Sequence, residues 1–252
     1  MTEREKFMYS VIGALSSLNA PIVFKGALVL KVLQEQTGNK SGLVRETQDI
    51  DGDWVGNKPS MEYLTNLMKK AVKIAGYNNV KVVAYREYSE GRSAGFRFIN
   101  SVNDYEIATM DLSIRYNPFS SRLATIDGLS FNGQIITKTL ADKIHVVTTR
   151  KICRRVKDLI DIYILSYIYN GSYKDIISIM DISGREVGKA DTLLRHTDDV
   201  IHAYSRYNNS AANLDFSIIC SRALIFLDPF LNPDKYKDCN LVWSIERGWL
   251  NV

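Results

Sequence analysis

Two aspartates separated by one apolar residue limit what this chain can fold into more than any other feature. They end the segment Arg45-Glu46-Thr47-Gln48-Asp49-Ile50-Asp51. Side chains alternate between the two faces of a β-strand, so Asp49 and Asp51 would project from one face while Ile50 packs behind them. Two carboxylates placed in this way can share a hard divalent cation. Isolated pairs of this kind also occur in solvated loops, so the surrounding sequence has to decide.

A strand that turns directly into a helix precedes the two aspartates. The apolar residues 22–24 are followed by Lys25, and Gly26-Ala27 opens a helical pattern that continues to residue 36. A glycine that starts a helix can bind phosphate, because the first N–H groups of the helix have no partner within it. The alternative is that Gly26 only tightens the turn and Lys25 is solvated. Together with the aspartates, the turn favours metal-assisted nucleotidyl or phosphoryl transfer.

Neighbouring residues allow two interpretations each. Thr47 could hydrogen-bond a triphosphate or only favour the strand, and Arg45 could pair with phosphate or with Glu46. Gly52 is expected to bend the strand, so Asp53 is interpreted as a supporting or simply exposed carboxylate.

Periodicity predicts an α+β fold with a mixed or antiparallel sheet flanked by helices. Helices are expected over the apolar-periodic residues 5–19, 27–36 and 60–75, with Gly76 closing the last one. Three segments rich in β-branched and aromatic residues indicate an antiparallel meander, at residues 80–88, 93–100 and 105–116. In the last of these Asp111 lies on the polar face, where it is a candidate third carboxylate.

The pattern becomes helical beyond residue 137 almost to the C-terminus. We therefore expect one domain over residues 1–137 and a mostly helical lobe over residues 138–252. Trp243 and Trp249 are expected to fill a core or an interface.

Composition excludes several classes of protein. With 252 residues, 46% of them hydrophobic and 24% charged, the chain is typical of globular proteins. The charged N-terminus and the absence of any stretch near twenty apolar residues favour a cytosolic protein with no membrane partner. The three cysteines have no CxxC spacing, which favours reduced thiols over disulfides or structural zinc.

Basic residues are concentrated between residues 143 and 157, although the formal net charge is only +4. On one continuous helix, four charged residues would lie within about 40° of Lys143: Arg150, Arg154, Lys157 and Asp161. Such a face could bind a polyanion. It could equally be a solvated surface with Arg154–Asp158 and Lys157–Asp161 ion pairs. The β-branched run at residues 146–149 could break the helix, and the argument would then fail.

Four separated segments, read in order, resemble the AbiEii/AbiGii-type nucleotidyltransferase toxins of the DNA polymerase β-like nucleotidyltransferase superfamily. The resemblance covers about residues 22–165 and is carried by Phe24-Lys25-Gly26-Ala27, by Arg45-x-Thr47-x-Asp49-Ile50-Asp51, by Ala141-Asp142-Lys143-Ile144, and by Arg150 with Lys157-Asp158-Leu159-x-Asp161. It implies a minimal nucleotidyltransferase domain joined to a helical lobe. It also implies two Mg²⁺ ions, a nucleoside triphosphate substrate and a cognate antitoxin, as in toxin–antitoxin and abortive-infection systems.

The resemblance implies a role for each matching residue. Asp49 and Asp51 would bind metal, with Asp111 sharing a second ion. The nucleotide would contact the turn, a threonine before the aspartates and two distant lysines. These residues are Lys25, Gly26 and Ala27, then Thr47, then Lys143 and Lys157. Asp158 and Asp161 would belong to a C-terminal catalytic motif. From their place in the basic cluster, we expect Arg150, Arg154 and Arg155 to line a groove for an acceptor such as tRNA or another RNA, and a protein hydroxyl would also fit.

One departure from the family pattern leaves alternatives open. The superfamily commonly has serine or a second glycine where this chain has Ala27, which offers an N–H but no hydroxyl. A weakly active or inactive nucleotide- or RNA-binding regulatory module is therefore the main alternative. A metal-dependent nuclease is a third.

Overall fold

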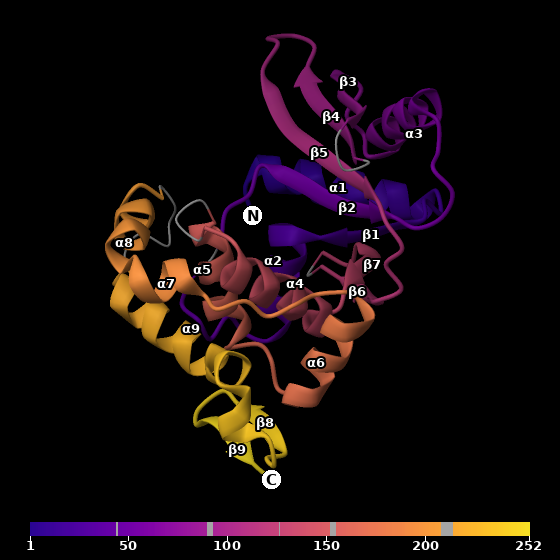
Figure 1. Ribbon diagram of the computed structural model, residues 1–252. Helices are drawn as coiled ribbons and strands as arrows, with labels where there is room; N and C mark the ends of the chain where they lie inside the picture. The colour runs from indigo at the N-terminus through magenta and orange to yellow at the C-terminus, as the bar shows by residue number, and fades with distance from the viewer. Residues whose placement is uncertain (44, 90–92, 126, 152–154, 208–213) are drawn as a thin grey trace. The chain divides into compact units, whose positions relative to one another are not determined.

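The computed structural model describes residues 1–252 except 44, 90–92, 126, 152–154 and 208–213 (Figure 1). Contacts divide the chain into two compact units. The first contains Met1–Val32 and Thr47–Gln134, and the second contains Leu33–Glu46 and Ile135–Val252. The boundary expected from the sequence lies near residue 137 and leaves residues 33–46 in the first domain, whereas the contacts assign these residues to the second unit.

The first unit is built on a seven-stranded mixed sheet in the order β3-β4-β5-β2-β1-β7-β6. Its strands are β1 (Ile22–Lys25), β2 (Asp49–Trp54), β3 (Val80–Ser89), β4 (Ser93–Asn100), β5 (Glu106–Ile114), β6 (Ser120–Ala124) and β7 (Ser130–Gln134). Strand β2 pairs antiparallel with β1 and parallel with β5. The predicted α+β class is confirmed, and β3–β5 form the predicted antiparallel meander. Strands β6 and β7 were not predicted.

Two helices of this unit pack together on one face of the sheet. Helix α1 (Glu3–Ser17) contacts α3 (Met61–Ile74) as well as β5 and β7. Phe7 of α1 packs edge-on against Phe98 of β4, with the ring centres 5.4 Å apart. Since Phe98 and Met110 share this face with Ile50, the alternating side chains of β2 and β5 project from the opposite face. This leaves the opposite face for the acidic residues.

The second unit is mostly helical. Its helices are α4 (Ile136–Thr149), α5 (Val156–Leu165), α6 (Tyr173–Ile182), α7 (Asp191–Arg195), α8 (Thr197–Ser205) and α9 (Phe216–Leu231), followed by a 3₁₀ turn (Pro233–Tyr236). A hairpin of β8 (Leu241–Ser244) and β9 (Gly248–Asn251), which was not predicted, ends the chain. Trp243 is fully buried against Phe226 and Trp249, so the prediction of a core position is confirmed for Trp243, whereas Trp249 is half-buried. Among the described helices, none is long and apolar enough to cross a membrane.

The basic residues do not lie on one continuous helix, and of the two alternatives the break at the β-branched run is the one observed. Helix α4 ends at Thr149, Arg150 is extended, and α5 begins only at Val156. The Thr148 hydroxyl donates to Ile144 O at 2.7 Å, and the Thr149 hydroxyl donates to His145 O. Side-chain bonds of this kind compete with the hydrogen-bond pattern of the helical backbone. Lys143 therefore lies on a different helix from Lys157, and the single basic helix face does not form.

Candidate active site

The candidate acids lie side by side on β2 and β5. In the parallel register Asp51 is paired with Asp111, and Asp49 with Thr109. All four side chains point to the face opposite α1, because they alternate with buried Ile50 and Met110. The sequence-predicted carboxylates thus share one sheet face on neighbouring strands.

Polar side chains hold two of these carboxylates in place. The Thr109 hydroxyl donates to Asp49 Oδ1 at 2.5 Å. Asp111 Oδ1 accepts the Tyr85 hydroxyl at 2.7 Å and Arg86 Nη1 at 3.1 Å. Burial and the bond to Asp111 raise the pKa of Tyr85 to about 12, so the hydroxyl remains a donor at neutral pH.

Gly26 is required where β1 turns into α2 (Gly26–Gln36). Its φ of +75° is in the left-handed region, and a Cβ at this position would lie 2.3 Å from Asp51 Oδ2. The Asp51 carboxylate therefore packs directly on the backbone at the start of the helix. Ala27 follows as a buried residue whose side chain offers no hydrogen bond.

Lys25 is ion-paired with Asp53. Asp53 is 4% exposed and also accepts a hydrogen bond from Asn117 at 2.9 Å. The expected bend at Gly52 is wrong, because β2 continues to Trp54. Of the two interpretations of Asp53, the exposed carboxylate is wrong, because its carboxylate is buried between two donors, and the supporting role stays a prediction. The phosphate-binding role of Lys25 stays a prediction.

The donor set suits a hard cation such as Mg²⁺. Asp49 and Asp51 provide only oxygen atoms, and magnesium is typically held by one or two carboxylates together with substrate phosphates and water. Within the described ranges, no three carboxylate, histidine or cysteine side chains are grouped closely enough to hold a metal ion by themselves. The two carboxylates by themselves fit part of the oxygen donor set that magnesium requires.

A buried ionic network occupies the second unit. Lys143 Nζ lies 2.5 Å from Asp158 Oδ1 and 2.6 Å from Asp161 Oδ2. Arg45 pairs with Asp161, and Arg155 Nε lies 2.6 Å from Asp158. The carboxylate side chains are only 2% and 1% exposed. These opposite charges outweigh the effect of burial, lowering the pKa of Asp161 and raising the pKa of Lys143.

The network corrects two sequence-based pairings. Arg45 binds Asp161 and not Glu46, and in the described structure the partners of Asp161 are Arg45 and Lys143 in place of Lys157. Lys157 is exposed. The predicted triphosphate contact of Lys143 would require this lysine to share its charge with two buried carboxylates.

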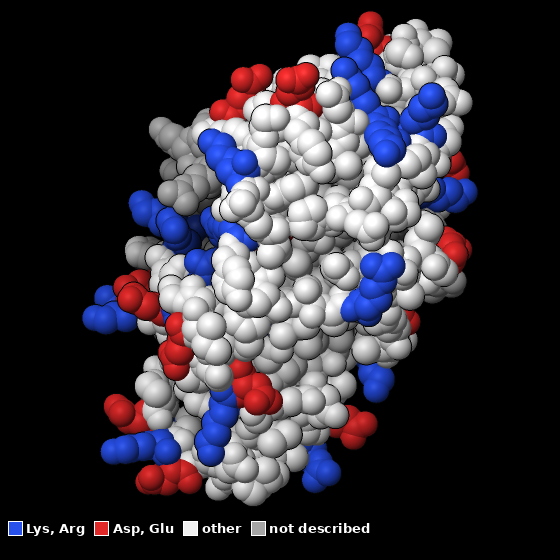
Figure 2. Space-filling model, turned by 90° about the vertical axis from the view of Figure 1, so that its right-hand side faces the viewer, with Lys and Arg blue, Asp and Glu red and all other residues white. Residues whose placement is uncertain are grey.

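The basic residues predicted to bind an acceptor lie only partly within the described structure. Arg150, Lys151 and Arg155 line a cavity of about 560 Å³ together with Val146. Arg154 lies outside the described residues. On the face shown in Figure 2, several lysines and arginines gather at the upper right, and the others are separated by uncharged areas.

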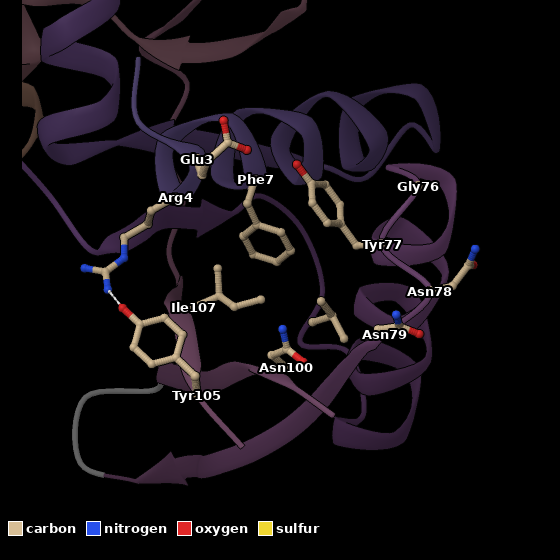
Figure 3. A pocket seen from close by; sticks show the side chains of 11 residues that line it. Glu3, Arg4, Phe7, Gly76, Tyr77, Asn78, Asn79, Asn100, Tyr105 and Ile107 are labelled. Carbon is tan, nitrogen blue, oxygen red and sulfur yellow. Dashed lines mark hydrogen bonds between the residues drawn. The ribbon is translucent and has the colours of Figure 1, made fainter. Parts of the chain in front are cut away.

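A separate cavity of about 530 Å³ belongs to the first unit. Figure 3 shows Phe7 and Ile107 at its centre, with Asn79 and Asn100 along one side and the Arg4–Tyr105 hydrogen bond along another. None of the predicted metal-binding acids is among its lining residues.

Sequence analysis missed the residues that support the acids, namely Tyr85, Arg86, Thr109 and Asn117. One signal was present. Gly95 lies inside a strand, where glycine often marks the close approach of another group.

Comparison with known proteins assigns the fold. No protein-family model matches the chain, and no curated protein matches it. A solved structure described as a "putative nucleotidyltransferase from H. pylori" aligns over 94% of this chain and 99% of that chain, with a TM-score of 0.55 and 17% identity. The nucleotidyltransferase toxin MenT4 from Mycobacterium tuberculosis H37Rv aligns over 87% of this chain and 80% of that chain, with 15% identity. Its TM-score of 0.47 is too low for a structural conclusion. The chain therefore has a nucleotidyltransferase-like fold.

Proposed function

We propose that this protein is a metal-dependent nucleotidyltransferase that transfers a nucleoside monophosphate from a nucleoside triphosphate to an acceptor. One observation carries the proposal: Asp49 and Asp51 share a face of β2, and the Asp51 carboxylate packs on Gly26 at the start of α2. The carboxylates that we propose as metal ligands are thereby adjacent to the helix terminus that we propose binds phosphate. The fold shared with the H. pylori structure supports this reaction class.

In this proposal the protein acts by binding, orienting and neutralising. A magnesium ion held by Asp49 and Asp51 would supply charge neutralisation for the triphosphate. The N–H groups at the start of α2 would orient the phosphates, and Thr109 keeps Asp49 in place. An acceptor hydroxyl forms a bond to the α-phosphorus, the bond from the α-phosphorus to the β-bridging oxygen breaks, and pyrophosphate leaves. The hydroxyl proton is lost to water.

The nature of the acceptor rests on the resemblance to AbiEii/AbiGii-type toxins. We propose RNA, with tRNA as the first candidate, and a toxin role opposed by a cognate antitoxin. The cavity lined by Arg150, Lys151 and Arg155 supports a polyanionic acceptor, since three cations surround it. Lys143, Lys157 and Asp158 are assigned to this reaction only through the resemblance.

Transfer can be tested with nucleotides labelled at the α or the γ phosphate. Purified protein is incubated with Mg²⁺, each labelled nucleotide in turn, and total RNA. We expect α-label to enter RNA and γ-label to be released, and we expect Asp51→Asn to abolish labelling. Asp127→Asn, at an exposed acid of the same unit, is the control and should behave as wild type. Label from the γ-phosphate in the acceptor would instead indicate phosphoryl transfer, and RNA shortening would indicate a nuclease.

A nucleotide-binding regulatory module is the second candidate. It is favoured by Ala27, a buried residue at the turn whose side chain offers no hydroxyl to a phosphate. A regulatory module would retain labelled nucleotide through a desalting column without transferring it to any RNA or protein band.

A further inference from the structure

Tyr85 reaches Asp111 through three features of the sheet that act together. The first is a β-bulge. Ala84 pairs with Phe96 and Arg86 pairs with Gly95, so Tyr85 is the extra residue on β3. Bulges redirect a side chain relative to the regular alternation of the strand, and they are frequent next to active sites.

The second feature is Gly95, which stands directly opposite Asp111 in the antiparallel register of β4 and β5. A Cβ at Gly95 would lie 2.6 Å from Tyr85 Cζ. The tyrosine ring therefore occupies the space that a side chain at Gly95 would fill, and its hydroxyl reaches Asp111 on β5. Any other residue at this position would displace the ring.

The third feature is the way the ring and the carboxylate are held. The guanidinium carbons of Arg86 and Arg97 lie 5.4 and 5.0 Å from the centre of the Tyr85 ring. The Tyr85 hydroxyl donates to Asp111 Oδ1 at 2.7 Å. In the described part of the chain, the hydrogen bonds to this carboxylate, from Tyr85 and Arg86, both end on Oδ1.

We infer that Tyr85 is a positioning residue for metal binding, which anchors Oδ1 of Asp111 so that Oδ2 can serve as a ligand beside Asp51. The inference rests on the proposed function. Carboxylates that bind metal are commonly fixed by an outer hydrogen bond, and the loss of such a bond typically weakens metal affinity by 10- to 100-fold. The bulge, the glycine and the hydroxyl then serve one purpose.

The test uses Mn²⁺ alone as the probe, with its binding to the full chain followed by electron paramagnetic resonance. Tyr85→Phe removes only the hydroxyl and is expected to raise the Mn²⁺ dissociation constant roughly tenfold or more. Tyr88→Phe is the matched control, because the Tyr88 hydroxyl lies on the same strand but donates to Pro59 O at 2.5 Å. This control should bind Mn²⁺ as wild type does.

Gly95→Ala provides an independent arm. It should weaken Mn²⁺ binding as Tyr85→Phe does, but it should have no further effect in a Tyr85→Ala background, where no ring remains to be displaced. In transfer assays Tyr85→Phe should raise the Mg²⁺ concentration for half-maximal activity while KM for the nucleotide at saturating Mg²⁺ is unchanged. If Tyr85 had a purely structural role, Tyr85→Phe would leave both the Mn²⁺ affinity and the Mg²⁺ concentration for half-maximal activity unchanged.

The outcomes separate the inference from the proposed function. If Asp51→Asn abolishes Mn²⁺ binding while Tyr85→Phe binds as tightly as wild type, the role of Tyr85 is overturned and the metal site stands. If wild type fails to bind Mn²⁺, or Asp51→Asn binds it unchanged, both are overturned.

Discussion

Removing the charge of Asp161 should destabilise the second unit severely. In Asp161→Asn the cations of Arg45 and Lys143 lose a shared partner, although their side chains are only 10% and 17% exposed. Breaking a buried ion pair by removing one partner typically costs about 3–5 kcal/mol, because the remaining charge is left without compensation. We expect a loss of the same size in the free energy of unfolding.

Urea unfolding followed by tryptophan fluorescence measures this loss. A Trp54→Phe background leaves Trp243 and Trp249, both in the second unit, as the reporters. Asp191→Asn is the control, since Asp191 forms an exposed pair with Arg195 at 3.6 Å. An exposed pair of this kind contributes about 0–1 kcal/mol. A loss below about 1 kcal/mol in Asp161→Asn would refute the reasoning about the buried network.

The same variant carries a pH signature. The pKa of Asp161 is lowered in the folded protein, so its contribution to stability is present above the unfolded value of about 3.9 and is lost as pH falls through the folded value. The stability difference between wild type and Asp161→Asn should therefore be full at neutral pH and shrink as the solution becomes more acidic than about pH 4. A difference that stays constant down to pH 2 would contradict the assignment.

Two further predictions concern the first unit. Gly26→Ala should reduce transfer at least tenfold, because the new methyl group displaces the Asp51 carboxylate. It should also lower the free energy of unfolding by about 1–2 kcal/mol, because the φ angle is unfavourable for alanine. Activity and urea unfolding measured together check this, and wild-type transfer would contradict it. Asp53→Ala should lower the free energy of unfolding by about 2–4 kcal/mol, since Lys25 and Asn117 lose a buried acceptor; thermal unfolding checks this, and an unchanged midpoint would show that the contact is dispensable.

The sequence predicted most of the first unit because its signals are local. The alternation around Asp49 and Asp51 placed both on one face of a strand, and the same pattern placed Asp111 on a polar face. The pairing of β2 with β5 could not be predicted in this way. It joins strands more than fifty residues apart, and only the sheet topology brings Asp51 opposite Asp111.

The errors have physical causes that lie outside local pattern. Asp53 is buried because Asn117 and Lys25, from distant segments, satisfy its charge. Arg45 pairs with Asp161, which lies 116 positions away in the sequence. Local sequence could suggest only a neighbour such as Glu46 as its partner. The helix break after Thr149 was foreseen as an alternative from the β-branched run, and the hydroxyl bonds to the preceding turn account for it.

The most direct test of the central claim is the intact mass of an acceptor RNA after incubation with the protein, Mg²⁺ and one nucleoside triphosphate. The account predicts that the RNA gains the mass of whole nucleoside monophosphates, and that Asp51→Asn leaves its mass unchanged. A gain equal to a single phosphoryl group, an equal gain with Asp51→Asn, or no gain with any RNA, protein or nucleotide tested would contradict nucleotidyl transfer by this site.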